Sequence, residues 1–466
     1  MPIYIYNSLT RKKEEFTPAS TFKANIYTCG VTVYDDCHIG HARSLYIFEV
    51  IRRYLKYRHF KVNFVRNITD IDDKIINRAK ELNLDWRSLV EKYIAGYYED
   101  LESLEIDKAD SEPRATENIA DMVSYITELI EKGYAYTTNT GVYFKVRKFK
   151  DYGRLSGQSI DEMLSGARKE PDETKQDPLD FALWKVSQPG EPFWDSPWGQ
   201  GRPGWHIECS VMSQKFLKTD TLDIHAGGRD LIFPHHENEI AQSEALTGKP
   251  FARYWIHHGL LTINGQKMSK SLGNFLTIKD FMSKYHDADI LKLLFLSAHY
   301  SHPIDYNADK IKDCRKQKKN FDNAFDSINN WIENKNRLVT LENNKIKVDN
   351  IVAKFEAAMD DDFNTPSALA SLFALADLTS SFISGDKKEA FSYAKAKLES
   401  LFEIFGLKPK PKKNLPSDML KMVAEREEAR KNKDFQKADA IREEIKTKFK
   451  YISMDTGSSA TFTEIE

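Results

Sequence analysis

The sequence predicts an α/β protein, in which a parallel-sheet domain with an insertion is followed by an α-helical bundle and a small C-terminal α+β unit. Three observations predict this class. A strand–helix–strand pattern lies near the N-terminus, a segment rich in Gly, Pro, Asp and Trp interrupts the sheet-like sequence, and a long helical stretch without strand character follows. Strand–helix–strand units build parallel sheets, and consecutive helices build bundles.

The first half of the sheet domain is expected at residues 1–132. Lys23 to Cys29 forms the first strand, a helix runs from about Gly40 to Tyr57, and Val62 to Ile68 forms the second strand. This order makes the two strands parallel. Further helices are expected at residues 89–103 and 119–132.

The insertion is expected at residues 133–204, where turn residues recur at short intervals and a hairpin is indicated around Thr137–Val146. Sheet-like sequence returns at Leu222–His225, and a helix is expected from Pro234 to Thr247. Residues 205–258 therefore form the second half of the sheet domain.

The rest of the chain divides into three parts. Residues 259–308 form a region with a Gly-containing loop, and residues 309–406 form the bundle, because the apolar pattern there is helical throughout. A proline-punctuated linker opens the terminal unit, residues 407–466, which has helices and a short strand at Phe449–Met454. Between Leu407 and Lys450 there are 14 Lys and Arg against 8 Asp and Glu. This balance indicates either a phosphate-binding surface or an ordinary solvated helix face.

Composition limits the classes of function. The chain has 466 residues, of which 41% are hydrophobic and 30% charged, and its formal net charge is −2. It lacks the run of roughly 18 apolar residues that a membrane span needs, and its polar N-terminus lacks the apolar core of a secretory signal. Four cysteines without a CxxC pair are too few for a disulfide framework. The expected compartment is the cytoplasm, and any metal site must combine distant residues.

The tetrapeptide His38-Ile39-Gly40-His41 follows the first strand and opens the first helix. A helix N-terminus presents unpaired N–H groups and the positive end of the helix dipole, which together favour an anion. Gly40 lets a ligand approach the backbone. His38 and His41 share one helix face, where their imidazoles can donate hydrogen bonds to phosphate oxygens. Two surface histidines at a helix start are the alternative.

A second motif, Lys267-Met268-Ser269-Lys270-Ser271, lies in a loop after a strand-like segment. Lysines are mobile point charges and serine hydroxyls add hydrogen bonds, so this composition suits a triphosphate on which charge develops during a reaction. An exposed loop with ordinary lysines is the alternative.

The histidine motif in the first strand–helix unit, followed by the lysine motif, resembles class I aminoacyl-tRNA synthetases. The resemblance implies a Rossmann-type catalytic domain that activates the carboxylate of an amino acid with ATP and Mg²⁺, and then transfers the amino acid to a tRNA. It also implies catalytic roles for His38, His41, Lys267 and Lys270. The implied ATP contacts are Gly40, His41, Asp230 and Lys270.

Two cysteines and a His-His-Glu segment form a third constellation. His235 and Glu239 are four residues apart on the expected helix and point the same way, whereas His236 points about 100° away and is a poor partner for Glu239. Cys29 ends the first strand, and Cys209 lies in a segment that can enter the same crevice. Two thiolates, an imidazole and a carboxylate suit a tetrahedral Zn²⁺ site. Buried apolar cysteines, another kind of metal site and a salt-bridged helix face are the alternatives.

Longer strings narrow the resemblance to cysteinyl-tRNA synthetases and cover nearly the whole chain. They are Tyr27 to Gly30, Thr32 to Asp35, Cys37 to Arg43, Trp194 to Cys209, Asp223 to Ser243, Lys267 to Phe275 and Asp360 to Pro366. In that family zinc is held by residues matching Cys29, Cys209, His235 and Glu239, and the substrate thiol joins the metal. The resemblance therefore implies one Zn²⁺ per chain, with ATP, L-cysteine and cysteine tRNA as substrates, and a monomer is expected.

Selection through a metal implies that no editing site is needed. A metal-bound thiol loses its proton, whereas serine offers a harder oxygen with a far higher pKa. Each tenfold preference needs about 1.4 kcal/mol, so several kcal/mol would suffice, and the insertion is too small for a hydrolytic domain. Trp205 is expected either to form a wall of the amino-acid pocket or to pack in the core. Asp230 is expected to contact the ATP ribose or the α-amino group.

The bundle and the terminal unit resemble the tRNA-binding half of that family. This implies a stem-contact role for residues 259–308 and anticodon binding by residues 407–466. The sequence departs from the family where Val31 and Ala226 replace common Pro and Gly residues, and Ala226 would crowd a close backbone approach. At the C-terminus Phe462 stands near a common Trp, and an aromatic ring can replace another as a base-stacking surface.

Three other functions fit parts of the sequence. An ATP-dependent ligase that joins cysteine to a small amine would share the catalytic half but needs no anticodon unit. A zinc hydrolase using the His-His-Glu segment leaves the lysine loop unexplained, and a non-catalytic tRNA-binding protein leaves both catalytic motifs unexplained. Charging of cysteine tRNA excludes the first, and turnover without ATP would favour the second.

Overall fold

A computed structural model describes residues 2–160, 162–163, 174–269, 272–332, 342–384, 388–409, 416–449, 451–456 and 459–464. The chain forms two compact units, Met1–Pro409 and Lys410–Glu466. Among the described residues, no helix combines the length and the apolar character that crossing a membrane requires.

A four-stranded parallel sheet lies at the centre of the first unit, in the order β10-β9-β3-β4. Its strands are β3 (Lys23–Thr32), β4 (Lys61–Thr69), β9 (Leu222–Gly228) and β10 (Ala252–His258). Strand β3, before the insertion, therefore pairs directly with β9, after it, so the two halves form one sheet. The predicted parallel sheet is confirmed, and all four carboxyl ends meet at one edge, where ligands bind in open α/β sheets.

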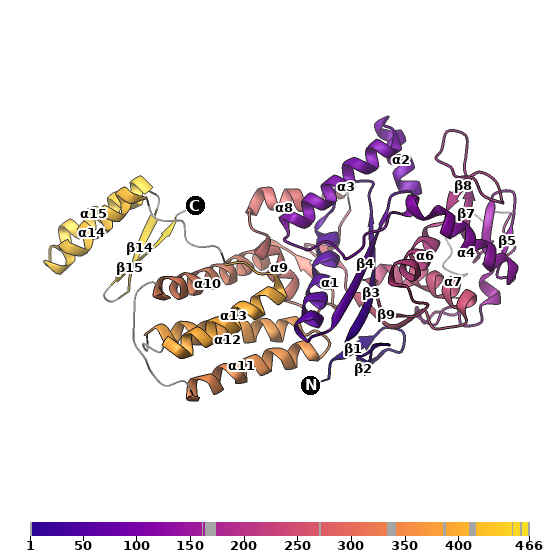
Figure 1. The fold of residues 1–466 in the computed structure, drawn as a ribbon. Helices are drawn as coiled ribbons and strands as arrows, with labels where there is room; N and C mark the ends of the chain where they lie inside the picture. Colours follow the sequence, from indigo (N-terminus) through magenta and orange to yellow (C-terminus); the bar gives the residue numbers. More distant parts are fainter. Residues whose placement is uncertain are drawn as a thin grey trace. The chain divides into compact units, whose positions relative to one another are not determined.

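Helices cover both faces of this sheet. Helix α1 (Ile39–Tyr57) lies on one face, and α6 (Trp205–Leu217) and α7 (Glu237–Thr247) lie on the other (Figure 1). Strand β3 shows why both faces are buried: Ile26 belongs to the apolar core under α1, while its neighbour Tyr27 belongs to the core under α6 and α7. Successive strand residues point to opposite faces.

The insertion contains a four-stranded antiparallel sheet, in the order β5-β6-β7-β8. Its strands are β5 (Ala135–Thr137), β6 (Gly141–Phe144), β7 (Phe181–Val186) and β8 (Gly201–Pro203). The β5–β6 pair is the hairpin expected around Thr137–Val146. Three helices precede it: α2 (Asp73–Leu82), α3 (Trp86–Ser103) and α4 (Ile119–Glu131).

Two small β-elements complete the first unit. An N-terminal hairpin is formed by β1 (Tyr4–Asn7) and β2 (Lys12–Glu15). A three-stranded sheet joins β11 (Leu261–Ile263), β12 (Gln266–Lys267) and β13 (Ile304–Tyr306).

The rest of the first unit is helical, as the periodicity predicts. Its helices are α8 (Ile278–Tyr285), α9 (Ala288–Leu296), α10 (Ala308–Ile332), α11 (Glu342–Asp360), α12 (Thr365–Ser384) and α13 (Lys388–Phe405). Helices α10 to α13 form the bundle, with a core that includes Phe321 and Phe402 and is continuous with the core under α1.

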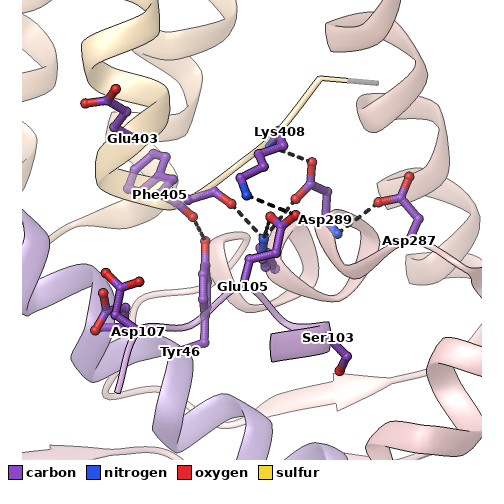
Figure 2. A network of polar contacts seen from close by, with 12 residues as sticks. Tyr46, Ser103, Glu105, Asp107, Asp287, Asp289, Glu403, Phe405 and Lys408 are labelled. Carbon is purple, nitrogen blue, oxygen red and sulfur yellow. Dashed lines mark hydrogen bonds and ion pairs between the residues drawn. The ribbon is translucent and has the colours of Figure 1, made fainter. Parts of the chain in front are cut away.

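A buried ionic network joins the bundle to the sheet domain (Figure 2). The Lys292 ammonium on α9 lies 3.0 Å from Glu105, 3.1 Å from Asp289 and 2.6 Å from the carbonyl oxygen of Gly406. The backbone N–H of Lys408 donates to the second oxygen of Asp289 at 2.9 Å. A buried cation needs such compensation because its desolvation costs several kcal/mol. The network therefore fixes the C-terminal end of α13 against the domain that carries the His38–His41 motif.

The second unit contains two helices and a hairpin: α14 (Ser417–Lys431), α15 (Phe435–Phe449), β14 (Tyr451–Thr456) and β15 (Ser459–Glu464). Met419, Ile441 and Ile445 form its small core. The sequence predicted one strand at Phe449–Met454, which was wrong in extent: helix α15 continues to Phe449, and a second strand pairs antiparallel with β14. The short segment 459–464 is polar, so its apolar pattern gave no strand signal.

Candidate metal and nucleotide site

A bulge in β3 presents Cys29 at the carboxyl edge of the sheet. The pairing of β3 with β4 shifts register between Thr28 and Val31, around Cys29 and Gly30. A Cβ atom on Gly30 would lie 1.5 Å from the carbonyl oxygen of Asn67, so only glycine fits there. The backbone N–H of Gly30 also donates to the Asn67 side chain at 2.8 Å. The glycine thus permits the close approach that turns this strand end.

The four predicted metal ligands come from four different elements and meet behind this edge. Cys29 lies in β3, Cys209 in α6, His235 in the turn Ile232–His236 and Glu239 in the first turn of α7. One ligand atom from each lies within 4.8 Å of all the others. The Cys29 sulfur is 3.9 Å from the Cys209 sulfur and 3.7 Å from Oε1 of Glu239, and His235 Nε2 is 3.0 Å from the same oxygen.

Electrostatics couple these groups tightly. Burial alone would lower the pKa of His235, but the Glu239 carboxylate and the Cys209 sulfur raise it to about 10. Burial would raise the pKa of Glu239, but His225 and His235 lower it to about 2. Burial, followed by the neighbouring Cys209, raises the pKa of the Cys29 thiol. The cluster therefore keeps Glu239 as a carboxylate, whose buried negative charge needs a positive charge beside it. A divalent ion would supply that positive charge and displace the protons.

The donor set fits Zn²⁺. Two sulfurs, an imidazole and a carboxylate are ligands that zinc takes in tetrahedral sites. His235 Nε2 is buried and lies 3.0 Å from Glu239 Oε1, so this nitrogen points into the cluster of ligand atoms. Its other nitrogen, Nδ1, lies 3.0 Å from Nδ1 of His206, and a second hydrogen bond of this kind orients ligating histidines.

His236 lies farther from Glu239 than His235 does, as predicted, but it faces the same cluster, which the sequence analysis did not expect. His236 Nε2 lies 3.2 Å from the Cys29 sulfur and 4.0 Å from Oε1 of Glu239. Two causes apply. His236 precedes Glu239 by three residues, which places it on a neighbouring position of the helix face. The preceding turn is also not a regular α-helix, because Phe233 has extended angles (φ −137°, ψ 133°) and α7 begins only at Glu237.

Three further histidines were missed by the sequence analysis. His225 in β9 approaches Glu239 at 2.7 Å, His206 follows Trp205 in α6, and His257 in β10 lies 2.8 Å from His236. His225 pairs in register with Tyr27, two residues before Cys29. Histidines in the carboxyl halves of the adjacent parallel strands β9 and β10 are the signal that would have identified His225 and His257.

The two histidines of the first motif cap helix α1. His38 Nδ1 accepts from the backbone N–H groups of Gly40 and His41 at 3.0 and 3.2 Å, and His41 Nδ1 accepts from the N–H of His38 at 3.2 Å. Their rings stack with centroids 3.7 Å apart. Burial lowers the pKa of His38 to about 4 and that of His41 well below its ordinary value, so both rings are neutral at pH 7. Because each Nδ1 is an acceptor, each ring carries its proton on Nε2.

The segment after the lysine loop is tied to the histidine motif by backbone hydrogen bonds. The N–H of Ile39 donates to Leu276 at 3.1 Å, and the N–H of Ile278 donates to Cys37 at 2.9 Å. Lys267 lies in β12 with its side chain exposed to solvent. Lys270 lies outside the described residues.

Trp205 and Asp230 flank the site differently. The Trp205 ring stacks on His235 at 4.0 Å and is only partly buried, and it lines a cleft of about 730 Å³ together with His206 and Pro234. Asp230 follows β9 in a short turn and is exposed. Ala226, expected to crowd the backbone, is fully buried in the core under α1.

Two family models match this chain. The model described as tRNA synthetases class I (C) catalytic domain matches residues 15–316, and the model described as DALR domain matches residues 354–408.

Curated relatives match almost end to end. A cysteine–tRNA ligase of Sulfurihydrogenibium sp. (strain YO3AOP1) is 50% identical, over 96% of this chain and 97% of its own. The cysteine–tRNA ligase of Thermodesulfovibrio yellowstonii is 50% identical over 95% and 96%, and that of Aquifex aeolicus is 46% identical over 96% of each chain.

Solved structures agree in fold at low identity. Mycobacterium tuberculosis methionyl-tRNA synthetase in complex with methionyl-adenylate superposes with a TM-score of 0.63 at 13% identity, covering 82% of this chain and 89% of that one. The Agrobacterium radiobacter K84 agnB2 LeuRS in its ternary complex with tRNA and LeuAMS gives 0.61 at 10% identity, over 84% of each chain.

Proposed function

This chain belongs to the cysteine–tRNA ligase family of class I aminoacyl-tRNA synthetases, and we propose that it selects cysteine through the cluster Cys29, Cys209, His235 and Glu239 holding one Zn²⁺. The enzyme joins cysteine to tRNA, with ATP as the energy source of this family. The near-complete match to its relatives includes the helical half, which a ligase acting on a small amine would not need.

We infer a reaction in two steps. The carboxylate of L-cysteine attacks the α-phosphorus of ATP, which carries Mg²⁺, and pyrophosphate leaves. A hydroxyl of the 3′-terminal adenosine of the tRNA then attacks the carbonyl carbon of cysteinyl-adenylate, and AMP leaves. In the first step negative charge grows on the phosphate oxygens, so fixed hydrogen-bond donors and cations stabilise the transition state.

The histidine motif supplies such donors. With both Nδ1 atoms engaged in capping, the Nε2–H groups of His38 and His41 are left to donate to phosphate oxygens. Gly40 leaves room for the His38 ring, because a Cβ there would lie 2.8 Å from it. Gly40 is also proposed to let the phosphates approach the helix backbone. Lys267 and Lys270 are proposed to bring mobile positive charge to the leaving pyrophosphate, and Asp230 to hold the ribose or the α-amino group.

The amino-acid pocket is proposed to lie between the metal cluster and Trp205. Zn²⁺, when bound, would supply a soft acid that takes a thiolate in preference to a hydroxyl. The four side chains hold it in place, Glu239 Oε1 lying within 3.7 Å of both Cys29 and His235. Trp205 lines the cleft and stacks on His235, so it fixes the His235 ring from the side of the cleft.

No editing site is proposed. Within the described residues of the insertion, the strands form one small four-stranded sheet. The tRNA is proposed to contact residues 259–308 with its stem, the bundle α10–α13 with its body, and the C-terminal unit with its anticodon. The enzyme is proposed to act as a monomer in the cytoplasm.

The convergence of two thiols, an imidazole and a carboxylate within 4.8 Å carries this proposal. We expect the purified protein to hold one equivalent of zinc, measured by inductively coupled plasma mass spectrometry, and to support cysteine-dependent pyrophosphate exchange. A metal-free protein with normal cysteine activation would contradict it.

Replacing His38 by asparagine should separate helix capping from chemistry. Asparagine caps helices well, so the free energy of unfolding should change by less than about 1 kcal/mol. Loss of one transition-state donor should slow pyrophosphate exchange about a hundredfold, or roughly 2.7 kcal/mol.

His59→Asn is the matched control, because this exposed histidine lies at the C-terminal end of α1 with φ 66°, a conformation that asparagine tolerates. The control should retain normal exchange. An unchanged rate in His38→Asn would remove His38 from the catalytic groups.

A further inference from the structure

A second set of four metal-binding side chains overlaps the first. Cys29, His225, His236 and Glu239 also bring one ligand atom each within 4.8 Å of all the others. This set shares Cys29 and Glu239 with the proposed zinc site but replaces Cys209 and His235 by two other imidazoles. The pocket thus offers one ion two adjoining sets of ligands.

The Glu239 carboxylate belongs to both sets and faces an imidazole of each. Its Oε1 atom is 3.0 Å from His235 Nε2, and its Oε2 atom is 2.7 Å from His225 Nε2. One carboxylate can therefore contribute an oxygen to either set without changing its rotamer. The side chain is fully buried, so no solvent competes for these oxygens.

His236 is oriented as a ligand by a chain of hydrogen bonds. Its Nε2 atom is directed at the Cys29 sulfur at 3.2 Å, while Nδ1 lies 2.8 Å from Nε2 of His257. His257 Nδ1 in turn lies 2.8 Å from the Ser8 hydroxyl. Metal-ligating histidines characteristically engage their second nitrogen in this way, because that contact fixes the ring and its tautomer.

His225 is fixed by packing. Its ring stacks on Trp255 with centroids 4.5 Å apart and an interplanar angle of 15°, and it meets Tyr27 edge to face. The imidazoles of the second set therefore rest on buried aromatic rings, whereas His235 of the first set rests on Trp205, which lines the cleft. The imidazoles of the two sets are therefore held by different aromatic rings.

We propose that the pocket has a second metal position, held by Cys29, His225, His236 and Glu239, which keeps the ion when the first set is incomplete. One thiolate, two imidazoles and one carboxylate are ligands that Zn²⁺ and Co²⁺ accept. The proposal rests on the zinc site proposed above. An ion held by these ligands would be displaced from the position that Cys209 and His235 define, so metal content and cysteine activation become separable properties.

The test uses the full-length chain in five forms: wild type, Cys209→Ala, His236→Ala, the double variant Cys209→Ala/His236→Ala and the control Cys209→Ala/His206→Ala. Each is equilibrated with Co²⁺ or Zn²⁺ and desalted, and its metal content and thiolate-to-cobalt absorption are measured. His206 contacts His235 but belongs to neither set, so it matches His236 as a deleted histidine.

We expect one equivalent of metal in wild type, His236→Ala, Cys209→Ala and the control, and none in Cys209→Ala/His236→Ala. Cys209→Ala should show about half the thiolate-to-cobalt intensity, because one thiolate remains, and its cysteine-dependent exchange should be lost. If Cys209→Ala does not fold, His235→Ala breaks the first set by a different change and should give the same metal content and half intensity.

Two results would overturn the second position alone: metal-free but folded Cys209→Ala or His235→Ala beside metal-loaded wild type, or a double variant that keeps its metal. Circular dichroism and thermal melting establish folding in each case. A wild-type protein that takes up no metal would instead overturn the proposed zinc site, and the second position with it.

Discussion

Replacing Cys29 by serine should remove the metal and abolish cysteine activation. Cys29 is the sulfur common to both ligand sets, lying 3.9 Å from the Cys209 sulfur and 3.2 Å from His236 Nε2. A serine hydroxyl is a hard, protonated oxygen and replaces a thiolate poorly on zinc. We expect kcat/KM for cysteine to fall at least about a thousandfold, or roughly 4 kcal/mol, in pyrophosphate exchange.

Cys314→Ser is the matched control for this change. Cys314 is a buried cysteine, whereas Cys29 is half-buried, and it lies in α10 of the bundle and belongs to neither ligand set. Its replacement should leave the zinc content at one equivalent and cysteine activation close to the wild-type rate. Normal zinc content in Cys29→Ser would show that the ion is held elsewhere.

The second large effect concerns serine, which differs from cysteine by one atom. We expect serine to be activated at least about ten-thousandfold less efficiently than cysteine, a difference of roughly 5.5 kcal/mol. The reason is chemical: the metal favours a thiolate, whereas a shape-based pocket distinguishes such isosteres by only about 1–3 kcal/mol. The measurement is pyrophosphate exchange with serine freed of cysteine.

The same prediction extends to editing. Cysteine tRNA carrying serine should lose it in the presence of the enzyme no faster than in buffer, because discrimination is complete at activation. Accelerated hydrolysis would reveal a deacylation site and refute the proposal that none exists. A cysteine-to-serine ratio below about a hundredfold would refute selection by the metal.

Local signals predicted much of the fold. The strands at Lys23 and Val62 and the helix from Gly40 were identified because apolar periodicity and a glycine boundary act over a few residues. The same kind of signal failed to predict strand β15 at residues 459–464, because this segment has few apolar residues. The strand forms by pairing with β14, and a contact between two strands is not a local preference of either one.

In the site, too, local features could be predicted from the sequence, whereas contacts between distant residues could not. The motif around His38 could be placed at a helix start from sequence, yet its double capping by Nδ1 atoms, which fixes the Nε2–H tautomers, required coordinates. His236 was judged by ideal helix geometry, and the turn before α7 does not follow it. His225 was missed because its role depends on strand register, which apolar patterning does not report.

By itself the sequence determined the chemistry that is available: two sulfurs, imidazoles and a carboxylate, two histidines at a helix start, a lysine loop, and the parallel sheet. Only the tertiary structure decided which of these groups meet. Cys29 and Cys209 are separated by 180 positions and touch because β3 and α6 pack against one another. Residue type and local periodicity report on residues that are close in sequence. The distance between two ligands depends instead on how whole strands and helices pack.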